Sequence, residues 1–175
     1  MIVWMDVAVV RSNIRSVVGL AGVALVLTAV VRLVPHDTHD SARAWQPPGG
    51  YVVADTVSVG GDRTLRLWTG PAGWYVESLA AGRHEGSVGA SGGGDQFTVS
   101  EILGGFVGNV PVAGTRAVSV RPHGGVAMHA DVHDGMFVLP AHVAGATEPA
   151  LLVTPIDAAG KPLAAETSVS IAGRI

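Results

Sequence analysis

The sequence predicts an all-β outer domain, an antiparallel β-sandwich, preceded by one transmembrane helix. Two observations carry this prediction: an uncharged apolar run near the amino terminus, and short β-branched runs separated by glycine-containing turns after residue 50. Of the 175 residues, 48% are hydrophobic and only 14% charged, and the formal net charge is -3. This composition fits one folded domain plus a membrane segment and argues against a nucleic-acid-binding protein.

The sequence contains no cysteine. A disulfide scaffold, a thiol nucleophile, a cysteine-ligated zinc site and a lipid-modified cysteine are therefore excluded. A sandwich built from this chain must be stabilised by packing and hydrogen bonding alone.

The apolar run extends from Ser16 to Val31, and it continues to Val34 if the helix includes Arg32 near its end. Nineteen residues at about 1.5 Å each span roughly 28 Å, close to the hydrocarbon thickness of about 30 Å. Arg32 reaches the headgroups on its long stem, and Pro35 ends the helix. Because the run has no polar face, a buried core helix is the weaker interpretation. Residues 16–35 are predicted to be a transmembrane signal anchor.

Arg11 and Arg15 precede the apolar run, as in a signal sequence. We therefore expect a single-pass protein of the plasma membrane, with residues 1–15 in the cytoplasm and the carboxy-terminal domain outside. Ala42-Arg43-Ala44 matches an A-x-A cleavage site, but it lies about ten residues beyond the apolar core, farther than such sites normally lie. Retention as an anchor is predicted over cleavage.

Residues 36–50 mix charges, prolines and glycines without a period and are predicted to be a linker. Residues 51–175 are predicted to form the extracytoplasmic β-sandwich domain, because short β-branched runs alternate there with turn dipeptides. The expected strands are Tyr51–Val59, Arg63–Thr69, Trp74–Leu79, Gln96–Leu103, Thr115–Arg121, Val126–His133, Met136–Leu139, Ala150–Asp157 and Leu163–Ile171.

Residues 115–139 are predicted to form a three-stranded meander. A two-residue turn at Asp134-Gly135 places Val132 opposite Phe137, so that the apolar faces meet. On the other side, a loop of odd length pairs Val118 with Ala130 and Val120 with Met128. The last strand is expected to direct inward Leu163, Ala165, Thr167, Val169 and Ile171.

Several turns and strands together resemble extracytoplasmic β-sandwich proteins of actinobacteria that are anchored by one helix and are mostly uncharacterised. The back half of that pattern is carried by Arg116–Val120, Gly124-Gly125, Asp134–Val138 and Val153–Leu163, and its front hairpin by Leu65–Val76. The resemblance implies an immunoglobulin-like or carboxypeptidase-regulatory-like sandwich. Many such proteins carry cysteines near the aromatic hairpin, and this chain has none.

One strand face carries His129, Asp131 and His133, and His123 and His142 are candidates for further ligands. Two imidazoles at i and i+2 on a strand can bind one zinc ion. The competing interpretation is a solvated strand face, because consecutive side chains on one face stand about 6.6 Å apart. Metal binding is therefore kept as the alternative hypothesis.

No catalytic constellation is predicted. Residues 89–93 match G-x-S-x-G, but that nucleophile elbow needs a strand before it and a helix after it. Glu77, Glu85 and Glu101 have no spacing that pairs two carboxylates for glycoside chemistry, and they are expected to be solvated. No catalytic residue and no cofactor are predicted.

Trp68, Trp74 and Tyr75 surround one predicted turn and form the candidate binding surface. Two interpretations stay open: the rings fill the core, or they form an exposed platform for a sugar or a peptide. The sequence thus predicts a non-enzymatic, membrane-anchored module that presents a binding or structural surface to an envelope protein or glycan. The alternative is a metal-binding or metal-dependent envelope protein.

Overall fold

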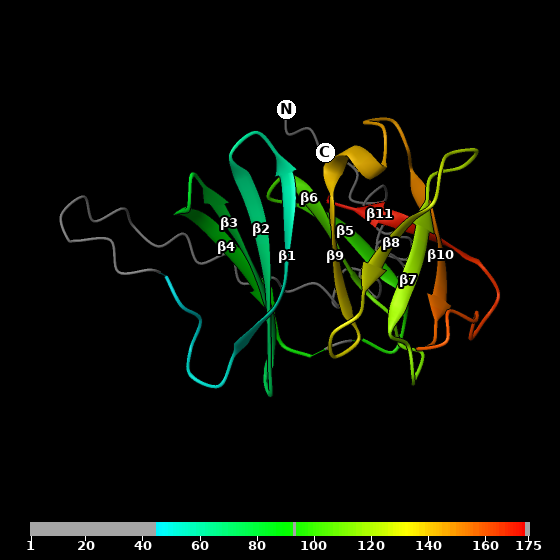
Figure 1. Ribbon diagram of the computed structural model, residues 1–175, viewed down its shortest axis with the longest axis horizontal. Coiled ribbons are helices and arrows are strands. Elements are labelled where there is room, and N and C mark those ends of the chain that lie inside the picture. The colour runs from blue at the N-terminus through cyan, green and yellow to red at the C-terminus, as the bar shows by residue number, and fades with distance from the viewer. Residues whose placement is uncertain (1–44, 93, 174–175) are drawn as a thin grey trace, which may run out of the picture.

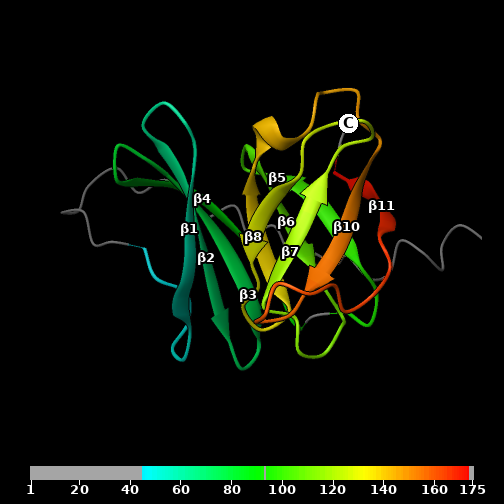
Figure 2. The ribbon, with the colours of Figure 1, turned by 45° about the vertical axis from the view of Figure 1, so that its right-hand side comes forward.

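The computed structural model describes residues 45–92 and 94–173, and this part of the chain is all-β. It forms a four-stranded sheet and a seven-stranded sheet that pack face to face (Figure 1). The sandwich-like arrangement and the all-β class agree with the sequence prediction. Figure 2 shows the four-stranded sheet as a separate layer beside the strongly curved larger sheet.

The predicted cytoplasmic segment 1–15, the predicted transmembrane helix 16–35 and the linker up to residue 44 lie outside the described residues. Within residues 45–92 and 94–173, no helix has both the length and the apolar character that a bilayer crossing requires.

The four-stranded sheet is an antiparallel meander in which neighbours in sequence are neighbours in space. Its strands are β1 (Val52–Gly60), β2 (Arg63–Gly70), β3 (Gly73–Ala80) and β4 (Arg83–Ala90). The sequence did not predict β4. The turn before it, Ala81-Gly82, has positive φ at both residues (47° and 75°), the geometry of a tight hairpin that normally carries Asn or Asp first.

The seven-stranded sheet has the order β8-β7-β10-β11-β5-β6-β9. A short 3-10 helix, η3 (Ala141–Val143), follows β9. The strands are β5 (Thr98–Ile102), β6 (Gly105–Asn109), β7 (Ala117–Arg121), β8 (Met128–Asp131), β9 (Met136–Pro140), β10 (Ala150–Ile156) and β11 (Thr167–Ala172).

This sheet nearly closes into a barrel. Its two edge strands, β8 and β9, are consecutive and are joined through Asp134-Gly135, with a bridge between His133 and Met136. The strands pair antiparallel, except that β11 runs parallel to β5. The predicted antiparallel sandwich is therefore confirmed only in part, because β5 and β11 come from distant parts of the chain and no hairpin fixes their relative direction.

The predicted pairing of β7 with β8 is confirmed, since Val118 lies opposite Ala130 and Val120 opposite Met128. The meander does not extend to a third strand: β9 pairs with β6 along its whole length, and only the bridge between His133 and Met136 joins it to the residues after β8. The sequence missed β6 together with the turn before it, Leu103-Gly104, where φ is 52° and 82°. The last strand begins later than predicted, and Leu163 is 39% exposed.

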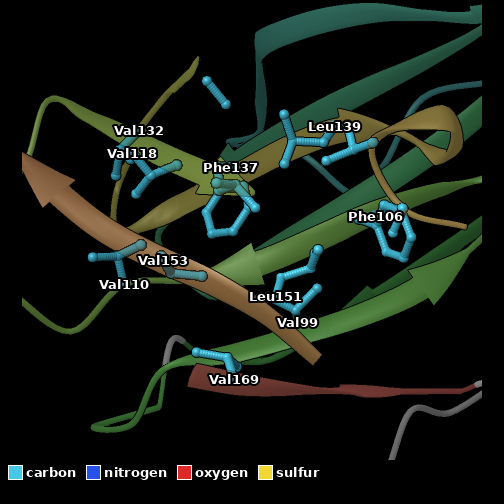
Figure 3. Packing of buried hydrophobic residues seen from close by; sticks show 14 residues of the cluster. Val99, Phe106, Val110, Val118, Val132, Phe137, Leu139, Leu151, Val153 and Val169 are labelled. Atoms are coloured by element: carbon cyan, nitrogen blue, oxygen red, sulfur yellow. The ribbon is translucent and has the colours of Figure 1, made fainter. Parts of the chain in front are cut away.

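Two hydrophobic clusters stabilise the fold, and β6 and β9 contribute to both. One cluster fills the near-barrel, where side chains from β5, β6, β7, β9, β10 and β11 point toward one another (Figure 3). The other lies between the two sheets and joins Leu65, Leu67, Trp74 and Val76 to Val107, Met136 and Val138. Every residue of β6 and β9 is buried, as expected for strands covered on both faces.

Glycines in β6 allow this double burial. A Cβ at Gly105 would lie 2.4 Å from Leu65 Cδ1 and 2.6 Å from the carbonyl oxygen of Leu139, and a Cβ at Gly108 would lie 2.2 Å from Phe137 Cζ. These distances are far below ordinary van der Waals contact. The four-stranded sheet and the Phe137 ring therefore approach β6 only because it lacks side chains at these two positions.

We expect Gly105→Ala to destabilise the fold by about 1 to 3 kcal/mol, because the added methyl group meets a backbone oxygen that cannot move aside. The matched control is Gly86→Ala in β4, where a Cβ would lie 3.8 Å from Leu103 Cδ2, an ordinary contact. Chemical denaturation of the full chain measures both variants. Equal denaturation midpoints for the two variants would contradict the packing role of Gly105.

Candidate functional site

The three aromatic residues of the candidate binding surface do not share a face. Trp68 lies opposite Tyr75 across β2 and β3, whereas Trp74 lies opposite Thr69. Because side chains alternate along a strand, Trp74 points into the core between the sheets, and Trp68 and Tyr75 point to the other side. Trp74 is thus a core residue and is removed from the predicted surface.

Trp45 covers the outward pair, on the face of the four-stranded sheet that points away from the near-barrel. Its ring centroid lies 6.3 Å from that of Trp68 and 6.0 Å from that of Tyr75, both with edge-on geometry. It also stacks on His84 at 5.1 Å with an interplanar angle of 13°. We call Trp45, Arg66, Trp68, Tyr75, Glu77 and His84 the outer-face cluster.

Glu77 is the polar centre of the outer-face cluster and is only 1% exposed. Its Oε2 accepts hydrogen bonds from Trp68 Nε1 at 3.1 Å and from Arg66 Nη1 at 3.3 Å, and its Oε1 lies 3.2 Å from His84 Nδ1. An indole and a guanidinium only donate, so an ionised carboxylate fits them best. That arrangement assigns the proton of the His84 contact to Nδ1. The prediction that Glu77 is a solvated surface charge was wrong.

The hydrogen bonds to its oxygen atoms offset the desolvation free energy of burying this carboxylate. Arg66 also lies over the Trp68 ring, with Cζ 5.8 Å from the ring centroid, so one cation contacts both the carboxylate and the indole. The network fixes the orientation of Trp68 and His84 relative to the sheet. Trp45 contacts both of these side chains and also Tyr75.

Two glycines seat the tyrosine rings of the same face. A Cβ at Gly89 would lie 2.3 Å from Tyr75 Cδ1, and one at Gly70 would lie 2.7 Å from Tyr51 Cδ1. Each ring therefore packs closely against a residue without a side chain. The two rings meet edge-on at 4.9 Å. Burial, with a smaller contribution from the neighbouring Tyr75 hydroxyl, raises the pKa of Tyr51 above its ordinary value.

The residues of the metal hypothesis lie elsewhere, on the near-barrel. His129 and Asp131 are exposed on β8, and His133 is half-buried in the bridge to Met136. His123 is paired with Glu148, its Nδ1 lying 3.1 Å from Oε1. In residues 45–92 and 94–173, no three His, Asp or Glu side chains come together in a group suited to a metal ion. The metal hypothesis therefore rests on sequence spacing alone.

An open depression of about 430 Å³ lies at the end of the near-barrel. It is formed by the β6–β7 connection, residues 110–116, together with Val132, Asp134 and Gly135. Arg116 and Asp134 are its charged residues, and both are exposed. Neither the predicted aromatic surface nor the predicted metal site lies in this depression. Trp68 and Tyr75 are on the other sheet, and His129 is on the flank of the near-barrel.

No protein-family model matches the chain, and no curated protein and no solved structure shows significant similarity to it. The resemblance to anchored actinobacterial sandwich proteins therefore stays a prediction that rests on turns and strand patterns. The outer-face cluster has to be interpreted from its own geometry.

Sequence reasoning missed Arg66, Glu77 and His84, and it assigned Trp45 to a linker. A detectable feature did exist for Glu77. It is the only charged residue in the run Trp74 to Leu79, and its neighbours on the same strand face, Tyr75 and Leu79, are both large and mainly apolar. His84 and Trp45 offered no such pattern, because β4 was not predicted and Trp45 is distant from the strands it contacts.

We expect Glu77→Gln to destabilise the domain by about 2 to 4 kcal/mol, because the amide turns a donor toward Trp68 and Arg66 or toward His84. Glu166→Gln is the matched control, since its bidentate pair with Arg121 (2.8 and 3.0 Å) is about one-third exposed on both sides and should contribute less than about 1 kcal/mol. Urea denaturation of both variants measures the difference. A cost at Glu77 no larger than at Glu166 would show that the buried network is not stabilising.

Alkaline titration should show Tyr51 ionising above the ordinary pKa of tyrosine. The raised pKa of Tyr51 means that the stability linked to this group is fully present below the ordinary value of 10.0 and is lost as the pH rises through the folded-state pKa. Near-ultraviolet tyrosinate absorbance follows both tyrosines, because Tyr51 and Tyr75 are the two in the sequence. Tyr51→Phe should remove the part of the absorbance change that occurs above the ordinary value, and a late absorbance change that persists in this variant would refute the assignment.

Proposed function

We propose that this chain is a non-catalytic β-domain held outside the plasma membrane by residues 16–35, presenting a binding or structural surface to an envelope protein or a glycan. The observation that carries the proposal is the uncharged apolar run from Ser16 to Val31, which precedes an all-β domain by only a short connection. Arg11 and Arg15 before the run favour an amino terminus inside.

The use of the buried polar residues supports a non-catalytic role. Glu77, the most buried carboxylate among the described residues, has both oxygens engaged by side chains of its own sheet. Glu85 is likewise held by the Ser78 hydroxyl and by Arg63, which keep its pKa below the ordinary value. These carboxylates orient and stabilise their neighbours, and neither lines the depression near Arg116.

The proposed partner surface is the outward-facing flank of the near-barrel, where His129 is exposed and Ser119 and Thr154 are half-buried. There His129 lies opposite Ser119, which in turn lies opposite Thr154, so three polar side chains form one row across β8, β7 and β10. Hydroxyl and imidazole groups suit hydrogen bonding to a glycan or to a polar protein surface. We also propose that the domain is an immunoglobulin-like or carboxypeptidase-regulatory-like sandwich.

The proposal predicts that the full chain sediments with membranes and resists extraction by alkaline carbonate. External protease added to intact cells should degrade the domain, because it lies outside. Deleting residues 16–35 should move the chain to the soluble fraction, and a version with Thr28→Val should behave as the full chain does. A chain that is soluble, or protected until the cells are broken, contradicts the proposal.

A further inference from the structure

Trp45 lies seven residues before β1 begins, in the stretch that the sequence predicts to be a linker. It is half-buried, and its ring contacts three other rings on the outer face of the four-stranded sheet. Those three rings come from β2, β3 and β4. The chain is therefore attached to the domain at a point outside its first strand, on the face that points away from the near-barrel.

We propose that the outer face of the four-stranded sheet is a docking site for the segment that leads into the domain, with Trp45 as the docking residue. The tether then leaves the molecule from this face and not from the start of β1. The docking is intramolecular and does not depend on the proposed membrane anchor. Its consequence for orientation, described below, rests on that proposed function.

The side chains that Trp45 contacts are also held by other residues of the four-stranded sheet. Trp68 is fixed by its hydrogen bond to Glu77, Tyr75 is fixed over Gly89, and His84 is fixed by its contact with Glu77. Side chains that are held in this way lose less conformational freedom on contact with another ring than unrestrained side chains would. Stacking on one ring and edge contacts with two others are the arrangements that aromatic pairs prefer.

The segment after Trp45 is also suited to docking. Pro47 and Pro48 have fixed φ angles, which lowers the entropy that the segment loses when it is ordered. Gly50 has a φ of 95° and lets the chain turn into β1. Tyr51 then packs against Gly70, so that docking continues from Trp45 to the residue directly before β1.

Docking shortens the tether. From Pro35 to Trp45 the chain reaches at most roughly 35 Å, whereas from Pro35 to Val52 it would reach roughly 60 Å. A membrane helix ending at Pro35 would therefore hold the outer face of the four-stranded sheet close to the bilayer. The near-barrel, with the β10–β11 connection at its far side, would point away from it (Figure 1).

The first test measures docking itself. Since the sequence has no cysteine, Gln46→Cys gives a single site for a nitroxide label in the full chain in detergent micelles. The exposed Gln46 position should give a slow electron paramagnetic resonance spectrum, Trp45→Ala should add a fast component, and Trp45→Phe should restore part of the slow one. A label at Ala164→Cys, in the β10–β11 connection, reports unfolding and should not change.

Two results would overturn the docking proposal: a fast Gln46 label in the unsubstituted background, or a Gln46 label that Trp45→Ala leaves unchanged. A change at Ala164 in the Trp45→Ala variant would show global unfolding. In that case the Trp45→Phe chain decides. A Gln46 label that gains a partial fast component in Trp45→Phe supports docking, and one that Trp45→Phe leaves unchanged, or that is fast in the unsubstituted chain, overturns it.

The second test measures orientation in lipid vesicles that contain a gadolinium-chelate headgroup. A label at Ser58→Cys, exposed on the outer face of β1, should relax at least twofold faster than a label at Ala164→Cys. Equal rates, or faster relaxation at Ala164, overturn the orientation. A chain that does not float with the vesicles refutes the proposed membrane anchor instead, and leaves the docking proposal to be decided by the micelle test.

Discussion

The burial of β6 and β9 on both faces is the constraint on which the rest of the structure depends. One face of each strand belongs to the interior of the near-barrel and the other to the layer between the sheets. Phe106 and Phe137 point into the first, and Val107 and Val138 into the second. Because both clusters share these strands, the four-stranded sheet cannot shift without disturbing the packing behind them.

Glycine makes this double burial possible, but it also raises the conformational entropy that the chain loses on folding. Gly105 and Gly108 leave room for Leu65 and for the Phe137 ring, while Gly70 and Gly89 do the same for the tyrosines of the outer face. A glycine in a strand loses more backbone entropy on folding than other residues. The gain is close approach of aromatic rings and of a second sheet, which buries more apolar area. With no cysteine in the chain, such packing has to supply the stability.

Strands were predicted correctly from the sequence where the turn before them carries residues typical of a tight hairpin. Asp134-Gly135 is a dipeptide that favours a tight hairpin, and it was identified along with its flanking strands. Ala81-Gly82 and Leu103-Gly104 adopt the same positive φ angles but carry an alanine and a leucine where asparagine or aspartate is usual. The strands that follow these two turns, β4 and β6, are rich in glycine, so strand propensity did not reveal them either.

The outer-face cluster was harder to predict because its members meet only in three dimensions. Trp45 is separated by more than twenty residues from Trp68 and by almost forty from His84. Alternation along β2 and β3 was enough to place Trp68 and Tyr75 on one face and Trp74 on the other, once the strands were paired. It did not predict that Glu77 would lie beneath them, because a glutamate in a strand is usually solvated on its outer face.

The buried charge of Glu77 and the proposed docking of Trp45 favour each other. Without Trp45, the face that carries Glu77 would be an open sheet surface with a carboxylate, a guanidinium and an imidazole beside two aromatic rings. Water would then compete for the hydrogen bonds of Glu77, and its contacts with Trp68 and His84 would weaken. With Trp45 stacked on His84, water is excluded and the same contacts strengthen. Docking of the tether and ordering of the polar network are therefore expected to be cooperative, each lowering the free-energy cost of the other.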